Sequence, residues 1–449
     1  MQRLLVGCIL ACGAWIYFYS SRCLSGFTLS YAGTPTHSTY TSIRSSWHDT
    51  SLFSALWTSL NNHPAKAPLS PLPGHTSDRG EPSMSSWWVF REEELPAHRH
   101  KRWVLIAHRP TYSLVDSLAE LGVHLVRVYV PEHGLFGEKA AGTKVQDTTY
   151  RGIPVVSLYG PKKAPTPEEL RTVDAILFAL REVGVRHYTY LSTLAYVLKA
   201  AAEAQRPVWV LDFPNPHAHY SYGPLLEQRL TSFVGLYPIP LVPGLTIGEY
   251  AQLLVGERYI PPLELRVIPW KGWRRGSRLP NQPPFFTEPP SPALRSPEAI
   301  ELYPILGWYE GTCCISVGRG TPHPFEQVGI IVRYSLPRWD TILYGYRLRP
   351  VTFKPGDETQ AYHGWHIKRL YPGPVSLDSL FRLGFFLLKT FKQSVGPNES
   401  FYHSFFDKLF GSPQLRHIDT AAVESLYQHF RAPVEWIRKA AKYHLYEGN

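Results

Sequence analysis

The 449-residue chain is poor in cysteine and contains few charged residues. It has five cysteines, three near the N-terminus and two adjacent in the C-terminal half: Cys8, Cys12, Cys23, Cys313 and Cys314. Adjacent cysteines rarely bridge each other, and no Cys-x-x-Cys or Cys/His spacing typical of zinc occurs, so we expect neither a disulfide framework nor a metal site. Charged residues make up 18% of the chain and hydrophobic ones 44%, which is typical of a globular protein.

Two phosphate-binding motifs are also missing. The turn that follows the first expected strand, at 108–113, contains no glycine, so the dinucleotide fingerprint is absent. The sequence GEKAAGTK at 137–144 resembles a phosphate-binding loop, but Thr143 separates the second glycine from the lysine and puts the lysine in the wrong register. We therefore expect no nucleotide, and no other cofactor is indicated.

The basic residues form no continuous stripe. The formal net charge is +10, but it is spread along the chain, and HRHKR at 98–102 is a short block. A protein that binds nucleic acid usually concentrates its positive charge and interleaves it with aromatic residues. We expect no nucleic-acid partner.

The N-terminal apolar run is too short to span a bilayer as a helix. Leu4 to Tyr19 falls below the ~20 residues that a spanning helix needs and suits a signal-peptide core. Cys12 follows Ile9-Leu10-Ala11, a loose match to a lipoprotein cleavage site; an uncleaved anchor or cleavage near Ala32 are the alternatives. We expect residues 1–24 to be a signal peptide or a membrane or lipid anchor, and the protein to be exported to the periplasm or cell envelope.

Residues 25–96 are rich in Ser, Thr, Pro, Gly and His, and we interpret them as a leader or linker. Beyond them, strand and helix patterns alternate. Thr166-Pro167-Glu168-Glu169 forms a capping box that starts one of the helices. This alternation predicts an α/β fold, a Rossmann-like domain with a mainly parallel sheet over 97–300. The expected strands are 103–107, 124–130, 153–160, 175–180 and 208–212.

The pattern changes beyond Trp270, where a proline-rich crossing occupies 272–292. Strand-like runs at 329–336 and 346–353 precede helical patterns at 376–391 and 421–446. We therefore expect a smaller α+β auxiliary domain over 301–449.

Polar side chains follow several of the expected strands. Ligands of open α/β sheets bind beyond the carboxyl ends of the strands, so these side chains could converge on one site. The candidates are Glu132, His133, Tyr159, Glu182, Arg186 and Tyr188.

Each candidate has a structural alternative. Glu132 could cap a turn or pair with a lysine, and His133 could be a structural histidine. Glu182 lies between Arg181 and Arg186, whose charges should favour its ionised form, so a plain ion pair is its alternative. Two carboxyl groups are the usual requirement of glycoside hydrolysis.

Aromatic faces and hydroxyl groups are suited to sugar recognition. Tyr159, Tyr188 and Tyr190 supply both. Asp212, which ends a strand before Pro214 in LDFPNP, could simply anchor that turn.

Several stretches resemble one family, the NamZ-like exo-β-N-acetylmuramidases. They are PEHGLFGEKAAG, GIPVVSLYG, VGVRHYTYLSTL, LDFPNP, GLTIGEY, SVGRGTPHPFEQVG, FFDKLFGSPQLR and KYHLY, in order over about 103–446. The resemblance implies a Rossmann-like catalytic domain, a smaller C-terminal domain and an active site between them. It also implies an exported bacterial enzyme that needs no cofactor and removes N-acetylmuramic acid from the non-reducing ends of peptidoglycan fragments.

The resemblance implies catalytic and sugar-binding roles for individual residues. Glu132 matches the leading catalytic candidate of the family, with His133 beside it, and Glu182 stands where a second acid is typical. The expected sugar contacts are Arg186, Tyr188 and Arg319, together with Asn215 in LDFPNP.

The chain departs from the family pattern at several polar positions. Ala179, Arg181 and Glu182 replace the usual Asp, Gln and Asp, and further departures are His108, Phe213, Pro243 and Ala293. A catalytically inactive or altered-specificity envelope protein that binds muropeptides or sugars is therefore the alternative function.

The lactyl carboxylate of N-acetylmuramic acid should be recognised by an arginine, because the guanidinium fork grips a carboxylate with two parallel hydrogen bonds. Arg186 is the first candidate and Arg319, between Gly318 and Gly320, the second. In the alternative, Arg186 is the ion-pair partner of Glu182.

Overall fold

The computed structural model describes residues 85–132, 134–135, 147–277, 288–356, 358–396, 400–417 and 422–448, and the strands β1 (Cys8–Ala11), β2 (Ala14–Tyr17), β3 (His75–Thr76) and β4 (Pro82–Ser83) before them. The chain divides into two compact units, residues 1–72 and 73–449. In the first unit β1 and β2 pair antiparallel, and in the second β3 pairs with β4. Among the described residues, none of the helices combines the length and the apolar character needed to cross a membrane.

The N-terminal half of the second unit is built on a seven-stranded sheet in the order β11-β10-β9-β5-β6-β8-β7. Every neighbouring pair is parallel except β7 with β8, so the predicted α/β class and mainly parallel sheet are confirmed. The strands are β5 (Arg102–Ile106), β6 (His124–Val130), β7 (Thr148–Tyr150), β8 (Ile153–Ser157), β9 (Ala175–Phe178), β10 (Val208–Leu211) and β11 (Leu265–Ile268).

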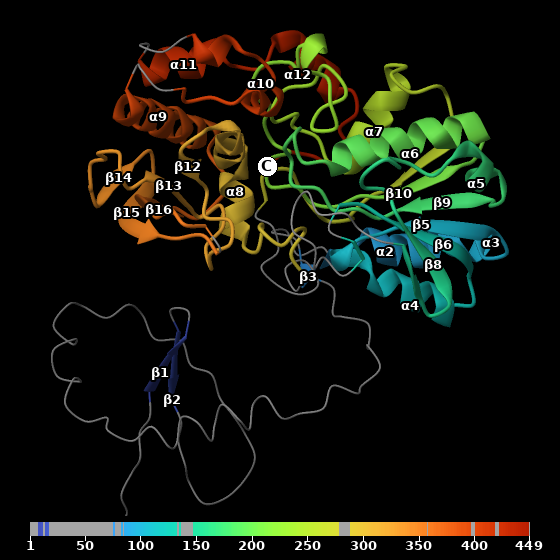
Figure 1. Ribbon diagram of the computed structural model, residues 1–449. Coiled ribbons are helices and arrows are strands. Elements are labelled where there is room, and N and C mark those ends of the chain that lie inside the picture. Colours follow the sequence, from blue (N-terminus) through green and yellow to red (C-terminus); the bar gives the residue numbers. More distant parts are fainter. Residues whose placement is uncertain are drawn as a thin grey trace, which may run out of the picture. The chain divides into compact units, whose positions relative to one another are not determined.

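Helices cover both faces of this sheet. Figure 1 shows α6 (Tyr190–Ala204) and α7 (Ile247–Gly256) on one face, and α2 (Ser86–Val89) and α4 (Ser113–Glu120) on the other. Alternate side chains of one strand enter two different cores: Val104 joins the cluster under α6, and Leu105 the cluster under α4. The short helix α5 (Pro167–Arg171) begins at the predicted capping box, in which Thr166 and Glu169 cap each other.

Helices form in part of the segment that the sequence assigned to the linker. Residues 85–96 were assigned to the linker, but they form α2, a π-helical turn (Phe90–Glu94) and the start of α3 (Leu95–His98). Phe90 is fully buried and meets Trp103 edge to face, with ring centroids 5.6 Å apart. This aromatic packing anchors the segment to the sheet, whereas the Ser- and Pro-rich composition suggested a linker.

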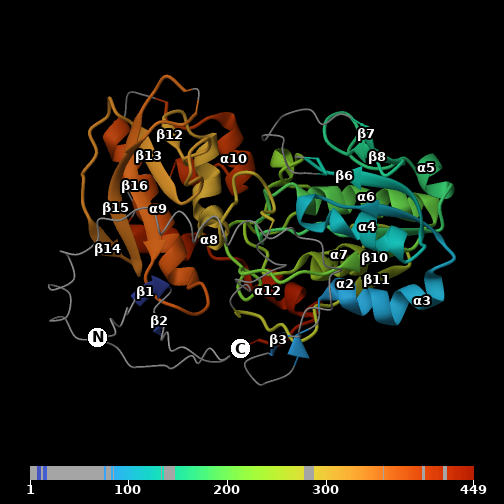
Figure 2. The ribbon, with the colours of Figure 1, turned by 90° about the horizontal axis from the view of Figure 1, so that it is seen from below.

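The C-terminal half contains a five-stranded antiparallel sheet in the order β12-β13-β16-β15-β14. Its strands are β12 (Ile315–Ser316), β13 (Gln327–Ile331), β14 (Thr341–Leu343), β15 (Tyr346–Phe353) and β16 (Tyr362–Arg369). The helix α8 (Pro297–Leu306) packs against α9 (Leu377–Val395), beside the sheet (Figure 2). Phe391 of α9 lies 5.9 Å, between ring centroids, from Trp365 of β16.

Four features of this half differ from the prediction. The helix expected at 421–446 is two helices, α11 (Val423–His429) and α12 (Val434–Ala441), because Pro433 interrupts the pattern and becomes the N-cap of α12. The strand expected at 329–336 ends at Ile331, and β16 was not predicted. A further helix, α10 (Ser404–Phe410), lies between α9 and α11 in the sequence.

The strand order reverses next to β5. From β5 the chain continues to β6 and β8 on one side, and then returns to β9 on the other. At this point Arg181 N donates to His108 Nε2 at 3.0 Å, and Thr111 Oγ1 donates to Ala179 O at 2.7 Å. Ligands of doubly wound sheets bind beyond the strand ends at such a switch point, so this edge is the place to look for the site.

Candidate active site at the switch point

Glu132 is the carboxylate that the fold presents at this edge. It follows β6 through Pro131 and is half-buried. Thr189, the residue before α6, donates its hydroxyl to Glu132 Oε2 at 3.4 Å, and Tyr190 OH donates to Glu132 O at 3.4 Å. The positive charges of Lys163 and Arg319 interact electrostatically with Glu132. Glu132 therefore lies where both domains contribute charge.

Tyrosines form a wall beside Glu132. The rings of Tyr188 and Tyr190 lie 4.6 Å apart, and both hydroxyls donate to Pro290 O, at 3.0 and 3.3 Å. Tyr303 of α8 meets Tyr188 edge to face at 6.1 Å. Burial raises the pKa of the Tyr190 hydroxyl, so it stays a proton donor. Tyr188 and Tyr190 are buried and pack edge to face, so their contribution is to shape the site.

A second aromatic group is more accessible. Tyr159, after β8, and Phe233 are both half-buried, with ring centroids 6.3 Å apart. Lys163 Nζ lies 4.0 Å from the centroid of the Phe233 ring and 5.1 Å from that of Tyr159. Burial lowers the pKa of Lys163, while the charge of Glu132 raises it. Tyr159 thus remains a candidate sugar contact.

Sequence reasoning missed Lys163 and Phe233. Lys163 follows the end of β8, so the rule that selected Tyr159 would also have selected it. Phe233 lies in a loop that carries no such signal.

Arg319 reaches the site from the C-terminal domain. Gly318 and Gly320, at φ 76° and 75°, adopt the left-handed conformation on either side of it. The Arg319 guanidinium pairs with Glu310 through Nε and through Nη2, the latter 3.1 Å from Oε2. Burial opposes the charge of Arg319, but Glu310 outweighs it and raises the pKa of Arg319 above its usual value. Glu310 is a carboxylate that the sequence did not single out.

The arginines near Glu182 in the sequence do not keep its carboxyl group ionised, contrary to the expectation. The residue is 5% exposed, and its carboxyl group accepts a hydrogen bond from Gly184 N and lies near Asp212 and Glu249. Burial, together with these two acids, raises the pKa of Glu182 to about 8. The prediction of an ionised Glu182 is therefore wrong, and Glu182 belongs to a buried acidic cluster.

This cluster joins the sheet edge to the C-terminal segment. Asp212 accepts hydrogen bonds from Thr246 Oγ1 at 2.7 Å, Gly248 N at 2.8 Å and Tyr446 OH at 2.8 Å. Glu249 pairs with the buried Arg275. Asp212 thus anchors the start of α7 and the KYHLY motif, in agreement with the turn-anchor alternative.

Asn215 has a structural role in this arrangement. Its Nδ2 donates to Leu245 O at 2.9 Å, and its Oδ1 accepts from His217 N at 2.8 Å. The side chain is buried and lies directly against Gly184. These contacts assign Asn215 to the support of the Gly184 turn and correct its expected role as a sugar contact.

Arg186 lies in the interior of the protein. It is 1% exposed and donates to three carbonyl oxygens: Pro224 O at 3.3 Å, Ile239 O at 3.0 Å and Leu409 O at 3.0 Å. Burial lowers the pKa of Arg186 to about 9. The Arg186 guanidinium donates its hydrogen bonds to main-chain carbonyl groups. This placement corrects both the expected contact of Arg186 with a sugar carboxylate and the alternative ion pair with Glu182.

His133 lies outside the described residues, as does the loop at 137–144, so the role of His133 stays a prediction.

The acidic cluster should make stability depend on pH through Glu182. Its folded pKa of about 8 exceeds its ordinary value of 4.5, so between these values the folded state binds more protons than the unfolded state. Stability should therefore fall as the pH rises from about 5 to 8. Glu182→Gln should flatten this slope in urea unfolding measured across the window, while Glu203→Gln, at an exposed position of α6, should not. Equal slopes in the two variants would contradict the assignment.

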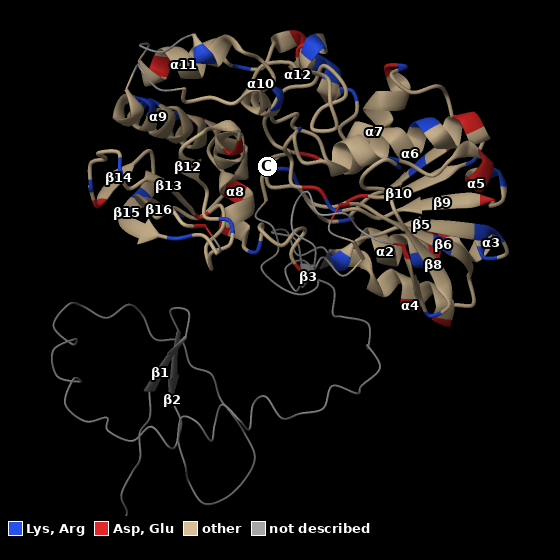
Figure 3. Cartoon of the chain, viewed as in Figure 1, with Lys and Arg blue, Asp and Glu red and all other residues tan. Residues whose placement is uncertain are grey.

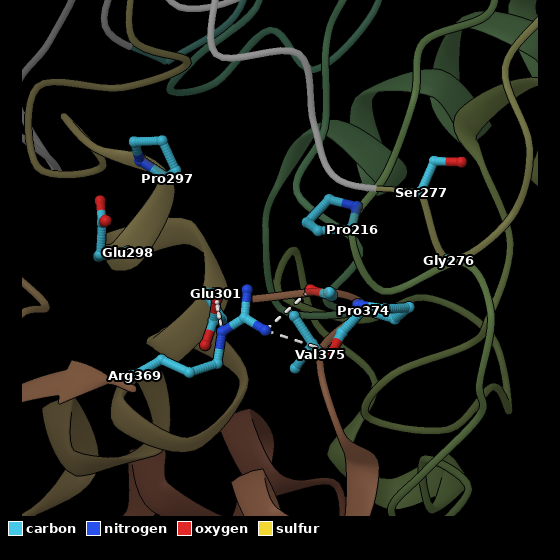
Figure 4. Close-up of a pocket in the computed structure, with 10 residues that line it drawn as sticks. Pro216, Gly276, Ser277, Pro297, Glu298, Glu301, Arg369, Pro374 and Val375 are labelled. Atoms are coloured by element: carbon cyan, nitrogen blue, oxygen red, sulfur yellow. Dashed lines mark hydrogen bonds and ion pairs between the residues drawn. The ribbon is translucent and has the colours of Figure 1, made fainter. Parts of the chain in front are cut away.

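In a pocket elsewhere, Arg369 and Glu301 already form an ion pair with each other. Figure 4 shows Arg369 directed at Glu301, with Nε 2.9 Å from the carboxylate, and at the loop of Gly373 and Pro374. Glu132 and Arg319 are not among its lining residues. We therefore place the candidate active site at the switch point.

Basic and acidic residues are interspersed along the elements of both domains, as on α5 and α12 (Figure 3).

Comparison with known proteins gives matches over both domains. Residues 106–298 match the N-terminal domain, and 301–446 the C-terminal domain, of a family described as exo-beta-N-acetylmuramidase NamZ. The peptidoglycan beta-N-acetylmuramidase NamZ of Bacillus subtilis (strain 168) is 36% identical over 349 residues, which are 74% of this chain and 82% of that protein.

Two crystal structures of DUF1343 family proteins from Bacteroides fragilis are similar to the chain. The first has a TM-score of 0.65 and 26% identity, and the match covers 82% of this chain and 100% of that one. The second has a TM-score of 0.68 and 27% identity, with 81% and 99% covered.

Proposed function

Because the chain belongs to the exo-β-N-acetylmuramidase NamZ family, we propose that it is a glycoside hydrolase that removes N-acetylmuramic acid from the non-reducing ends of peptidoglycan fragments. The observation that carries the proposal is the position of Glu132. Glu132 lies at the switch-point edge of the sheet, beside Thr189 and Tyr190, and interacts electrostatically with the positive charges of Lys163 and Arg319. A carboxyl group in such a position can exchange a proton with a glycosidic oxygen or with water.

In this proposal, four residues of the chain have separate roles in the reaction. Glu132 transfers the proton. Tyr159 and Phe233 provide aromatic faces for the sugar ring, and Arg319 binds the lactyl carboxylate. A guanidinium has five N–H donors, and Glu310 engages Arg319 through two of its nitrogens, so Arg319 has donors beyond those that Glu310 takes.

Three of the departures from the family pattern lie in the interior. Ala179, Arg181 and Glu182 are all buried, and Ala179 N continues the sheet by donating to Ile106 O at 2.9 Å. These side chains support the strand ends. The placement favours a retained reaction over the alternative of a protein that only binds muropeptides.

The test is incubation of the purified chain with a chromogenic β-N-acetylmuramide and with a disaccharide that has N-acetylmuramic acid at its non-reducing end. Release of N-acetylmuramic acid from both is the expected result. Saturable binding of either compound without release would favour the binding-protein alternative.

Export through residues 1–24 is a separate part of the proposal, with a lipid anchor at Cys12 as one form of it. The apolar run from Leu4 to Tyr19 supports it. Mass spectrometry of the N-terminus of the mature, cell-associated protein tests it, because an unprocessed Met1 would contradict cleavage.

Arg319→Met should impair the muramide selectively. Charge-assisted hydrogen bonds contribute about 1.5–3 kcal/mol, so kcat/KM for the muramide should fall about 10–100-fold while that for the matching glucosaminide changes little. Arg438→Met, at an exposed position of α12, is the control and should leave both rates unchanged. If kcat/KM falls equally for both substrates in the Arg319 variant, Arg319 has a structural role and does not bind the lactyl group.

A further inference from the structure

Three side chains of the C-terminal domain direct ligand-type atoms at one point. His323 and Glu326 lie in the loop that leads into β13, and His366 lies on the neighbouring strand β16. Glu326 Oε2 is 3.4 Å from His323 Nδ1 and 3.6 Å from His366 Nε2. All three ligand atoms lie within 4.8 Å of one another.

The two His–Glu separations match those between the ligands of a tetrahedral ion. Zinc binds nitrogen and carboxylate oxygen at ~2.0–2.2 Å, so two ligands at a tetrahedral angle lie roughly 3.3–3.6 Å apart. The two His–Glu separations fall in this range. The imidazole rings are perpendicular, with centroids 5.1 Å apart, so each presents a nitrogen to the shared point without stacking on the other.

The backbone holds the three residues in place. Gln327 and His366 are register partners in the antiparallel pair of β13 and β16, and Ile367 N donates to Glu326 O at 2.8 Å. His323 lies between two prolines, and its N–H donates to Thr321 Oγ1 at 3.2 Å. Such preorganisation lowers the entropic cost of binding an ion.

The carboxylate also has the outer-shell support that metal ligands usually have. Ser296, the N-cap of α8, donates its hydroxyl to Glu326 Oε1 at 2.5 Å, while Oε2 faces the histidines. Such an outer-shell hydrogen bond orients a ligating carboxylate and leaves its second oxygen for the metal ion.

We propose that His323, Glu326 and His366 bind one divalent transition-metal ion of the zinc class. Two imidazoles and one carboxylate suit zinc better than magnesium or calcium, which prefer oxygen ligands. The His323 side chain is 54% exposed, so a metal ion can enter from solvent and a water molecule can complete the coordination.

The ion would clamp the loop at 318–326, which also carries Arg319, onto β16 and the start of α8. Its effect on the proposed reaction is therefore indirect: it fixes the position of Arg319. The site itself does not depend on the proposed function, because metal binding is measured without a sugar.

The test is titration of the full chain, first dialysed against a chelator, with zinc chloride in a calorimeter. We expect one ion per chain with micromolar or tighter affinity, no heat from magnesium chloride, and a higher Tm with zinc. Cobalt(II) should give visible absorption without thiolate charge-transfer bands, which separates this site from binding by cysteines.

Two variants and a control make the assignment specific. His323→Ala changes an exposed side chain, and Glu326→Gln keeps the shape of the carboxylate; each should weaken zinc binding at least tenfold. His417→Ala, at another exposed histidine of the domain, should bind zinc as the unchanged protein does. Absence of stoichiometric binding, thiolate bands with cobalt, or equal affinity in all three variants would overturn the proposal.

Discussion

Glu132→Gln is expected to lower kcat about 10²–10⁴-fold on an N-acetylmuramide while the chain stays folded. Glutamine keeps the shape of the side chain and can still accept a hydrogen bond from Thr189, which lies 3.4 Å from Oε2. It cannot take up or deliver the proton that a glycosidic oxygen or water needs in the transition state. The measurement is kcat and KM with a chromogenic muramide, together with a circular dichroism spectrum and a Tm.

The matched control is Glu120→Gln, at an exposed position of α4 in the same domain, which should leave kcat unchanged. A KM that stays within a few-fold in the Glu132 variant would show that the loss is in the chemical step. An unchanged kcat in folded Glu132→Gln would remove Glu132 from the mechanism and direct attention to Glu310.

Arg186→Met is expected to destabilise the chain by roughly 2–5 kcal/mol without changing sugar selectivity. The buried guanidinium donates to the carbonyl groups of Pro224 and Ile239 in the N-terminal domain and of Leu409 in α10. Removing it leaves these acceptors buried without a donor, and it also removes a link between the two domains. Urea unfolding and Tm measure the loss.

Arg229→Met is the control for this prediction, since the Arg229 side chain is 69% exposed and should contribute little. The ratio of muramide to glucosaminide rates, measured per folded molecule, should be the same in Arg186→Met as in the unchanged protein. A stable Arg186 variant that loses only muramide activity would contradict the structural assignment.

The sheet and the location of the site could be predicted from the sequence, because both follow from periodicity and from the general behaviour of strand ends. The runs before Glu132, Tyr159 and Glu182 became β6, β8 and β9, and their carboxyl ends do lie at one edge. The direction of each side chain could not be predicted in this way. Arg186 follows the turn at Gly184 as expected, but enters the interior.

The ionisation state of Glu182 could not be predicted from the sequence, for a related reason. The sequence places Glu182 between two arginines, which predicted an ionised group, whereas folding buries it beside Asp212 and Glu249. Sequence neighbours are a poor guide to the electrostatic environment where residues distant in the chain meet. Burial decides the pKa of Glu182, and burial depends on the tertiary structure.

The cluster of His323, Glu326 and His366 shows a further limit. His323 and Glu326 are three positions apart in a loop, and His366 comes from a strand that the sequence did not predict. The antiparallel register of β13 and β16 alone brings them together. Spacing rules for metal sites work where ligands are close in sequence, and they miss a site assembled by strand pairing.

Exo-acting removal of N-acetylmuramic acid is tested most directly with two glycan fragments that differ only in the sugar at the non-reducing end. Mass spectrometry of the products should show N-acetylmuramic acid released from the fragment that begins with it, and the fragment that begins with N-acetylglucosamine left intact. Cleavage of both fragments, internal cleavage of either, or no cleavage of the first would contradict the proposed activity.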